Sequence, residues 1–136
     1  MSALEASQRL AVQEALARYA LALDDQDAAA LESVLTEDVS WNFTLAGQGD
    51  LGPVAGREAV LGFVRESWTT QTDRSRHYLS NVVVNGEGPD TAAARAYLLM
   101  TSDSRVVTTG SYRFSLRASG GEWRIAQLVL GMENAG

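Results

Sequence analysis

Residues 18–27 read Arg18-Tyr19-Ala20-Leu21-Ala22-Leu23-Asp24-Asp25-Gln26-Asp27, and this stretch ends one predicted helix and begins another. Apolar residues recur at Val12, Leu16, Tyr19 and Leu23, which is the spacing of one helix face, so Tyr19 is predicted to point toward the core. Asp24 falls at the edge of that face and at the helix C-terminus, where the helix dipole disfavours an acidic residue. Asp24 is therefore either a solvated turn residue or a functional carboxylate.

The composition is that of one globular domain covering residues 1–136. Hydrophobic residues make up 46% of the chain and charged residues 21%, which are ordinary values for a globular protein. A chain of this length can bury a hydrophobic core without disulfides or metal ions. No repeat, linker-like stretch or change of composition divides the sequence.

Missing residue types exclude several kinds of chemistry. The sequence has no cysteine, so disulfides, thiolate metal sites and cysteine nucleophiles are excluded. All 11 basic residues are arginine, which excludes a Schiff base on a lysine. Because His77 is the single histidine, a zinc site is not expected, and we expect the protein to work without a metal or another cofactor.

The charge balance and the N-terminal sequence limit the partners and the location. The net charge is −6 at pH 7 and the isoelectric point is near 4.7, which argues against nucleic acid as a partner. No apolar run is long enough to cross a membrane. The first five residues lack the basic flank and apolar core of a signal peptide, so we expect a cytoplasmic protein.

Three helices are predicted from capping residues and from apolar residues at helical spacing. Ser2 and Glu5 have the form of a capping box, which predicts that the first helix starts there and runs to about Leu23. Asp27 is predicted to cap the second helix, over residues 28–35, which residues 36–38 should end. The third helix is expected over residues 57–68.

Alternating apolar and polar residues predict five strands. Val39, Trp41, Phe43 and Leu45 alternate with polar residues and should face the core. The same period continues over residues 75–85, 91–102, 106–118 and 122–132. Residues 46–56, which hold four glycines and a proline, predict a loop. This order predicts an α+β fold in which a curved, mostly antiparallel sheet wraps over three helices and leaves a pocket for a small ligand.

Six short motifs lie along the chain: Arg18-Tyr19 followed by Asp24 and Asp27, Leu35-Thr36-Glu37-Asp38-Val39, Gly56-Arg57-Glu58-Ala59-Val60, Arg76-His77 with Asn81, Gly110 with Tyr112, and Trp123-Arg124-Ile125. In this order and spacing the sequence resembles the SnoaL-like branch of the NTF2-like superfamily over essentially its full length. That superfamily includes ketosteroid isomerase, scytalone dehydratase, bile-acid dehydratases, polyketide cyclases and the small subunits of ring-hydroxylating dioxygenases. The resemblance implies a cone-shaped α+β barrel around a deep apolar pocket.

The resemblance also implies a catalytic site of three residues. The dehydratases pair a tyrosine and an aspartate on the first helix with a histidine on the strand after the third helix, and Tyr19, Asp24 and His77 match these in type. A histidine oriented by an acid can remove a proton next to a carbonyl, while a tyrosine hydroxyl stabilises the resulting enolate. We therefore expect Asp24 and His77 to lie within hydrogen-bonding distance. The base position of ketosteroid isomerase would fall on Phe43, which cannot serve as a base.

A further set of residues is expected to bind the substrate: Trp41, Phe43, Phe63, Trp68, Asn81, Tyr97 and Tyr112. Asn81 should share a strand face with His77, because it lies an even number of residues away. Plain core packing is the alternative for the aromatic residues of this set.

Two functions from different classes remain open. One is a cofactor-free dehydratase, cyclase or isomerase that acts on an apolar polyketide-, steroid- or terpenoid-like carbonyl compound. The other is a non-catalytic small-molecule-binding protein or accessory subunit. Because the stretch over residues 91–102 is apolar on both faces and only one face can line a pocket, we also expect a homo-oligomer, a dimer or a trimer, formed through the convex face of the sheet.

Overall fold

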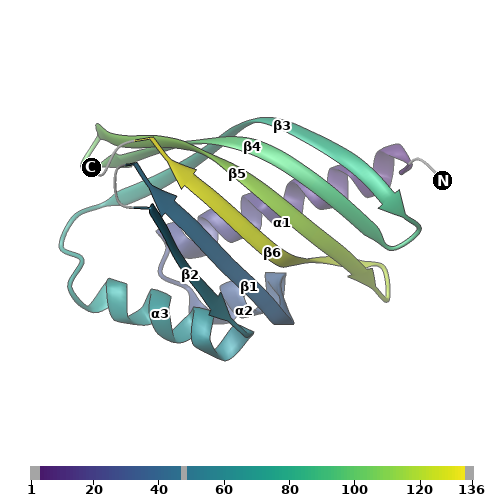
Figure 1. Cartoon of the computed structure of the whole chain (residues 1–136), viewed down its shortest axis with the longest axis horizontal. Coiled ribbons are helices and arrows are strands. Elements are labelled where there is room, and N and C mark those ends of the chain that lie inside the picture. The colour runs from purple at the N-terminus through teal and green to yellow at the C-terminus, as the bar shows by residue number, and fades with distance from the viewer. Residues whose placement is uncertain (1–3, 47–48, 134–136) are drawn as a thin grey trace.

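The computed structural model describes residues 4–46 and 49–133. Within them, three helices and six strands, one strand more than predicted, form the predicted α+β arrangement (Figure 1). The elements follow in the order α1 (Ala6–Asp24), α2 (Ala28–Val34), β1 (Leu35–Leu45), β2 (Gly49–Ala55), α3 (Arg57–Thr69), β3 (Ser75–Gly88), β4 (Thr91–Ser102), β5 (Arg105–Ser119) and β6 (Glu122–Met132).

The first two helices begin at polar capping residues. α1 begins after Glu5, whose backbone N–H donates to the side-chain oxygen of Gln8 at 3.1 Å, whereas the predicted cap residue Ser2 lies outside the described residues. α2 begins after Asp27, whose carboxylate accepts from the backbone N–H of Ala30 at 3.0 Å, as predicted. The predicted apolar face of α1 is buried at each of its four positions, Val12, Leu16, Tyr19 and Leu23.

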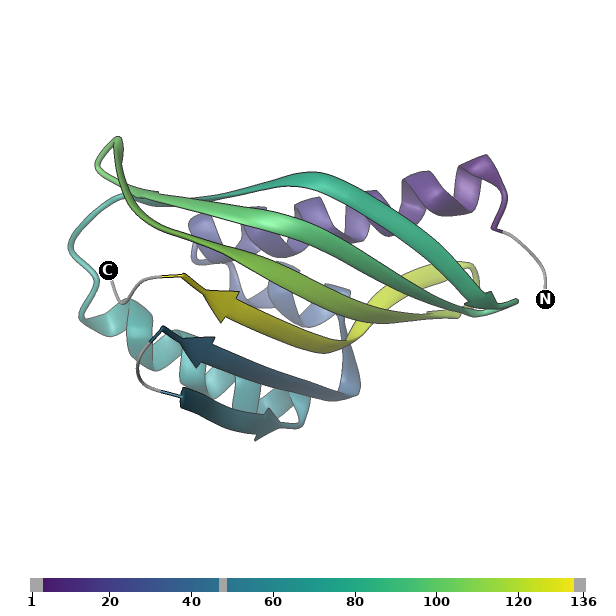
Figure 2. The same ribbon diagram turned by 45° about the horizontal axis from the view of Figure 1, so that its top comes forward.

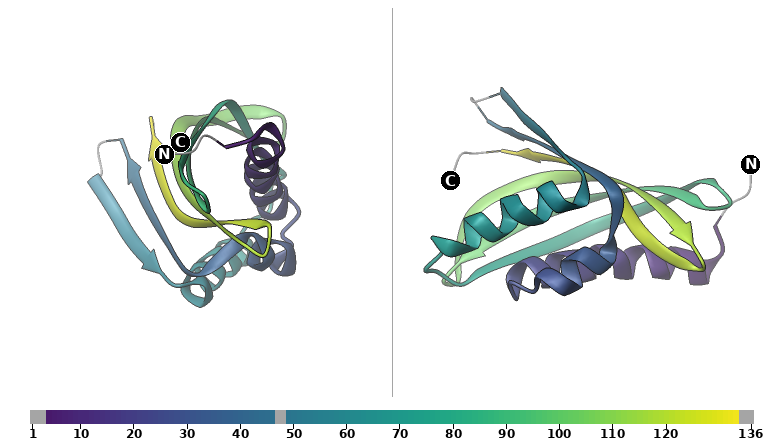
Figure 3. Two further views of the ribbon diagram at one scale, coloured as in Figure 1. Left: turned by 90° about the vertical axis from the view of Figure 1, so that its right-hand side faces the viewer. Right: turned by 90° about the horizontal axis from the view of Figure 1, so that it is seen from below.

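The six strands form one curved sheet in the order β2-β1-β6-β5-β4-β3. Four of the five pairings are antiparallel, and β1 runs parallel to β6. In Figure 2 the long strands β3, β4 and β5 arch together, and the left view of Figure 3 shows how strongly the sheet curls. The barrel implied by the resemblance is therefore open, because β2 and β3 remain as unpaired edges.

Strand β2 corrects the prediction of a loop over residues 46–56. It pairs antiparallel with β1 at the edge of the sheet, with partners such as Trp41 and Val54. An edge strand tolerates Pro53 because it needs backbone hydrogen bonds on one side only. Gly52 is needed here because its φ is +97° and an added Cβ would lie 2.8 Å from the carbonyl oxygen of Trp41. The second helix ends at Val34, before residues 36–38 as predicted, and those residues already belong to β1.

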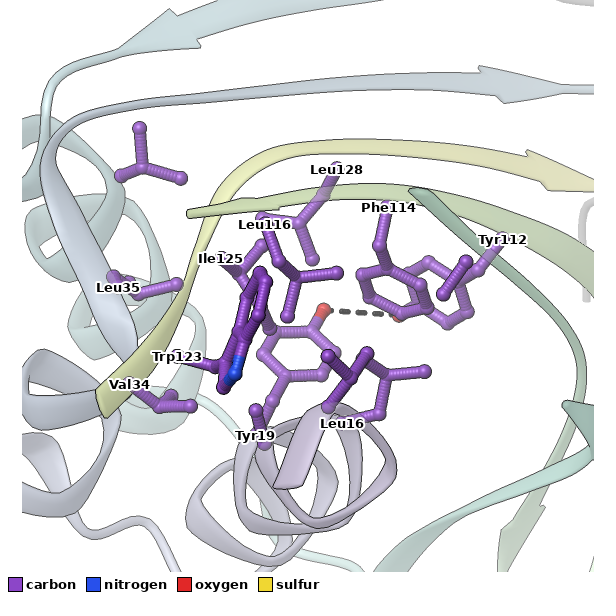
Figure 4. Packing of buried hydrophobic residues seen from close by; sticks show 14 of the residues in the cluster. Leu16, Tyr19, Val34, Leu35, Tyr112, Phe114, Leu116, Trp123, Ile125 and Leu128 are labelled. Carbon is purple, nitrogen blue, oxygen red and sulfur yellow. Dashed lines mark hydrogen bonds between the residues drawn. The ribbon is translucent and has the colours of Figure 1, made fainter. Parts of the chain in front are cut away.

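The core lies between the concave face of the sheet and the helices, which all cover that face (Figure 3, right view). The close-up in Figure 4 shows α1 with Leu16 and Tyr19 turned toward residues of β5 and β6. The largest fully buried side chains come from both layers, and they are Tyr112, Phe114, Leu16, Leu31, Leu35, Leu98, Leu116, Ile125, Leu128, Val12 and Val39. Burial of this apolar surface is the main contribution that holds the helices against the sheet.

Candidate functional site

A cavity of about 290 Å³ lies between α3 and the concave face of the sheet. Most of its lining is apolar, and its polar members are Ser67, Gln71, Ser75, His77 and Tyr112. The full lining is Leu23, Trp41, Phe43, Phe63, Val64, Ser67, Trp68, Gln71, Ser75, His77, Leu98, Met100, Tyr112, Leu130 and Met132. An apolar cavity with a few polar groups is the usual form of a small-molecule site.

Three aromatic rings form one wall of this cavity. Trp41 and Phe43 come from β1 and Phe63 from α3, and their ring centroids lie 5.5 to 5.9 Å apart. Phe63 stays 43% exposed, so this wall reaches the surface of the molecule. Trp68, one turn further along α3, also lines the cavity. These four predicted binding residues therefore lie together at the cavity.

Asp24 and His77 form the pair that the sequence predicted. Nδ1 of His77 lies 2.6 Å from Oδ1 of Asp24, and the side chains are 17% and 8% exposed. The backbone N–H of His77 also donates to both carboxylate oxygens, at 3.0 and 3.1 Å. The acid at the end of α1 is therefore neither solvated nor free, because it binds the first residues of β3.

This geometry determines which nitrogen of His77 is free to react. A carboxylate can only accept, so Nδ1 carries the proton that is shared with Asp24. In the neutral ring the lone pair is then on Nε2, the nitrogen that makes no hydrogen bond to the described residues. A histidine held in this tautomer by a carboxylate can act as a general base, as in other acid–histidine pairs.

Tyr19 and Tyr112 meet behind this cavity with their hydroxyl oxygens 3.0 Å apart (Figure 4). Both side chains are buried, but Tyr112 lines the cavity and Tyr19 does not. Burial raises the pKa of the Tyr112 hydroxyl to about 12, with the hydrogen bond shared with Tyr19 acting in the opposite direction and the negative charge of Asp24 adding to the rise. The pKa of Tyr19 is raised well above its usual value, first by burial and then by Tyr112.

Asn81 and Tyr97 lie outside the cavity, which corrects their predicted position. The register between β3 and β4 shifts between Ser80 and Val83, and Asn81 has a φ of +55°. This irregularity turns Asn81 onto the convex face of the sheet although its distance from His77 is even. Tyr97 is 56% exposed on the same convex face, where it lines a separate depression with Asn81.

Sequence reasoning missed the polar cavity residues Ser67, Gln71 and Ser75. Ser75 shares its strand face with His77, so strand parity could have identified it, whereas Gln71 lies in a loop and gave no signal. Ser75 also donates to the carboxylate of Asp73 at 3.1 Å, and Ser102 donates to the same oxygen at 2.5 Å. Both hydrogen bonds lower the pKa of Asp73, and the one from Ser102 has the larger effect. Together they connect the loop before β3 to the end of β4.

Among residues 4–46 and 49–133, no three His, Asp or Glu side chains gather in a way that could hold a metal ion. No helix in the same part of the chain is long and apolar enough to span a membrane.

The fold and the cavity define a class of protein: a curved open sheet over three helices, with a histidine in the wall of an apolar cavity that is hydrogen-bonded to a buried acid. Within that class, the chain belongs to the SnoaL-like domain family, whose model matches residues 4–129. Its structural neighbours belong to the NTF2-like superfamily, as the sequence resemblance implied. No curated protein sequence matches the chain significantly.

Solved structures agree with this assignment. A candidate aromatic ring hydroxylase from Novosphingobium aromaticivorans is 31% identical, with a TM-score of 0.79, 96% of this chain and 92% of that chain covered. A candidate scytalone dehydratase from the same species is 19% identical, with a TM-score of 0.75 and 93% and 84% covered. The hexachlorocyclohexane dehydrochlorinase LinA-type3 from Novosphingobium barchaimii LL02 is 20% identical, with a TM-score of 0.76 and 93% and 87% covered. At 19% and 20% identity, the candidate scytalone dehydratase and the dehydrochlorinase show only that the fold is shared.

Proposed function

We propose that this protein is a cofactor-free lyase or isomerase of the cytoplasm that removes a proton next to a carbonyl group of an apolar substrate. Dehydration, cyclisation and isomerisation of polyketide-, steroid- or terpenoid-like compounds can all begin with this step. The observation that carries the proposal is the 2.6 Å contact between Asp24 and His77, a residue that lines the cavity. Two structural neighbours are named for eliminations, a dehydratase and a dehydrochlorinase, which agrees with a proton-abstracting site.

In this proposal the three predicted catalytic residues, Tyr19, Asp24 and His77, act together with Tyr112. His77 takes the proton through Nε2, and Asp24 stabilises the imidazolium ion that forms. Tyr19 and Tyr112 supply paired hydroxyl groups that can stabilise the developing enolate oxygen. The proton later leaves His77 for the product or for solvent, so the base is regenerated without a cofactor.

The lining of the cavity favours a neutral substrate. Within residues 4–46 and 49–133, which hold all 11 arginines, none lines it, so an anionic group bound there would lack a cation to compensate the loss of its hydration. The aromatic wall of Trp41, Phe43 and Phe63 offers a surface for a flat, apolar ring system. We therefore infer a neutral cyclic ketone or hydroxyketone as the substrate class.

One observation favours the rival function, a non-catalytic binding protein. Asp24 accepts from the backbone N–H of His77 as well as from its ring, so the carboxylate also has a structural task in joining α1 to β3. A protein that only binds a small molecule could keep the pair for that reason alone. The two functions differ in whether proton transfer occurs.

Proton exchange on a neutral bicyclic ketone, 2-tetralone, separates the two functions without knowledge of the natural substrate. The ketone is incubated with the protein in D₂O, and loss of the protons next to the carbonyl is followed by NMR. We expect exchange above the buffer rate, which His77→Ala reduces by about 10²–10⁴-fold. Asp24→Asn should reduce exchange as well, while Asp25→Asn, which removes the exposed neighbouring carboxylate, should not. Tight binding of 2-tetralone without exchange would instead support the binding protein.

A further inference from the structure

The two buried tyrosine hydroxyls have different access to the cavity. Tyr112 belongs to the cavity lining, together with Leu98 and Leu130 on the neighbouring strands β4 and β6. Both side chains are buried, with Tyr19 2% and Tyr112 1% exposed, but of the two only Tyr112 lines the cavity, and Tyr19 reaches it through the 3.0 Å contact between the two hydroxyls. A ligand in the cavity would therefore meet Tyr112 first.

The direction of the hydrogen bond between the two hydroxyls follows from counting protons. Each hydroxyl carries one proton, so only one of the two donates within the pair. If Tyr112 donated to Tyr19, the proton of Tyr19 would have no acceptor among the described residues and would be buried unpaired, which is costly. If Tyr19 donates to Tyr112, the proton of Tyr112 is free to bind a group in the cavity.

We propose that Tyr112 is the catalytic hydroxyl that donates to the carbonyl oxygen of the bound substrate, and that Tyr19 is a positioning residue that donates to Tyr112. This inference rests on the proposed function, and it gives Tyr112, expected only to bind substrate, the catalytic role that the resemblance implied for Tyr19. In the reaction step, His77 removes the proton next to the carbonyl, and the electron pair of that C–H bond forms the new C=C bond. The former C=O electron pair moves to the oxygen, which accepts the hydrogen bond of Tyr112.

The packing around Tyr112 holds its hydroxyl in one place before a ligand binds. Its ring stacks on Phe114, with centroids 4.8 Å apart and planes at 19°, and Tyr19 meets both rings edge-on at 5.9 and 6.0 Å (Figure 4). A donor that cannot reorient costs no reorganisation when the charge develops, which is the basis of oxyanion stabilisation. Donation by Tyr19 also polarises the Tyr112 hydroxyl and makes it a stronger donor.

The acidities agree with this division of roles. Burial keeps both hydroxyls protonated at neutral pH, so each is available as a donor. Both donors of the proposed chain, Tyr19 to Tyr112 and Tyr112 to the substrate, are therefore protonated.

The test uses 2-naphthol, an aromatic analogue of the enol that 2-tetralone forms. Its protonation in the protein is followed by absorbance, because a hydrogen bond donated to the naphtholate oxygen lowers the pKa of the bound probe. We expect Tyr112→Phe to raise that pKa by about one to two units, since the bound anion loses a charge-assisted hydrogen bond. Tyr19→Phe should raise it less, and the double variant should match Tyr112→Phe alone. Tyr78→Phe, which removes a hydroxyl that is 51% exposed, is the matched control.

The outcomes separate this inference from the proposed function. In a His77→Ala background, Tyr112→Phe should still raise the pKa of bound 2-naphthol, so the hydroxyl assignment survives a failure of the base assignment. A larger effect of Tyr19→Phe than of Tyr112→Phe, additive effects of the two, or no effect of either would each overturn the proposal. So would a wild-type protein that does not bind 2-naphthol. Each single variant leaves the other hydroxyl without its partner, whereas the double variant Tyr19→Phe/Tyr112→Phe removes both hydroxyls. The double variant therefore serves as the comparison if a single variant is unstable.

Discussion

Asp24→Asn should destabilise the protein measurably, because the carboxylate joins α1 to β3. Its two oxygens accept from the backbone N–H of His77 at 3.0 and 3.1 Å, and Oδ1 also accepts from Nδ1 at 2.6 Å. Asparagine keeps one acceptor oxygen and turns an NH₂ group toward the same donors. One charge-assisted hydrogen bond is therefore lost at a side chain that is only 8% exposed, which costs about 1.5–3 kcal/mol of unfolding free energy.

The loss should appear as a lower melting temperature. At about 4 °C per kcal/mol for a domain of this size, Tm should fall by roughly 6–12 °C, measured by circular dichroism. Asp25→Asn provides the control, because Asp25 is the neighbouring acid and is exposed. Equal Tm values for the two variants would refute the reasoning, since the carboxylate would then make no contact that matters in solution.

Three further predictions concern other parts of the molecule. Gly110→Ala should lower the free energy of unfolding in urea by about 1–3 kcal/mol, because the added Cβ would overlap the backbone of Gly131. Gly62→Ala is the control, since its Cβ meets no other atom and should not destabilise α3. Equal unfolding free energies for the two variants would contradict the close approach of Gly110 to Gly131. The hydrogen bonds from Ser102 and Ser75 lower the pKa of Asp73, so the contribution of Asp73 to stability is present above its unfolded-state pKa and is lost as the pH falls through its folded-state pKa. An NMR titration should show that Ser102→Ala raises the pKa of Asp73. An unchanged pKa in this variant would count against the contact. The convex face exposes Tyr78, Val83, Tyr97 and Leu99, so light scattering at micromolar concentration should give the mass of a dimer or trimer, and a monomer would contradict the expected oligomer.

The sequence predicted the parts of the fold that depend on local pattern. The α1 face around Leu16 and Tyr19 and the alternating strands from residue 75 onward are short-range signals, and each is found in the structure. β2 was missed because its glycines and proline have no strand preference, and pairing with β1 alone makes it a strand. Local propensity cannot report such pairing.

The candidate site shows the same division between local and long-range information. Asp24 could be singled out from local sequence, because an acid is unfavourable at a helix C-terminus. Its hydrogen-bond partner His77, which explains why an acid stands there, lies 53 residues away in the sequence. Asn81 was placed wrongly because a single irregularity in β3 reverses strand parity, and no residue type marks its position. The contact between Tyr19 and Tyr112 spans 93 residues and could be found only in three dimensions.

The position of β6 between β1 and β5 affects how this protein can be made. A chain folds from its N-terminus during synthesis, but the β1–β2 hairpin and the β3–β4–β5 meander have no direct pairing until β6 emerges and bridges them. Leu130 and Met132 of that strand also line the cavity, so a nascent chain carries an unfinished binding site with its apolar wall exposed. The order of synthesis therefore leaves this apolar surface uncovered until β6 has been made, and during that interval the chain is open to aggregation.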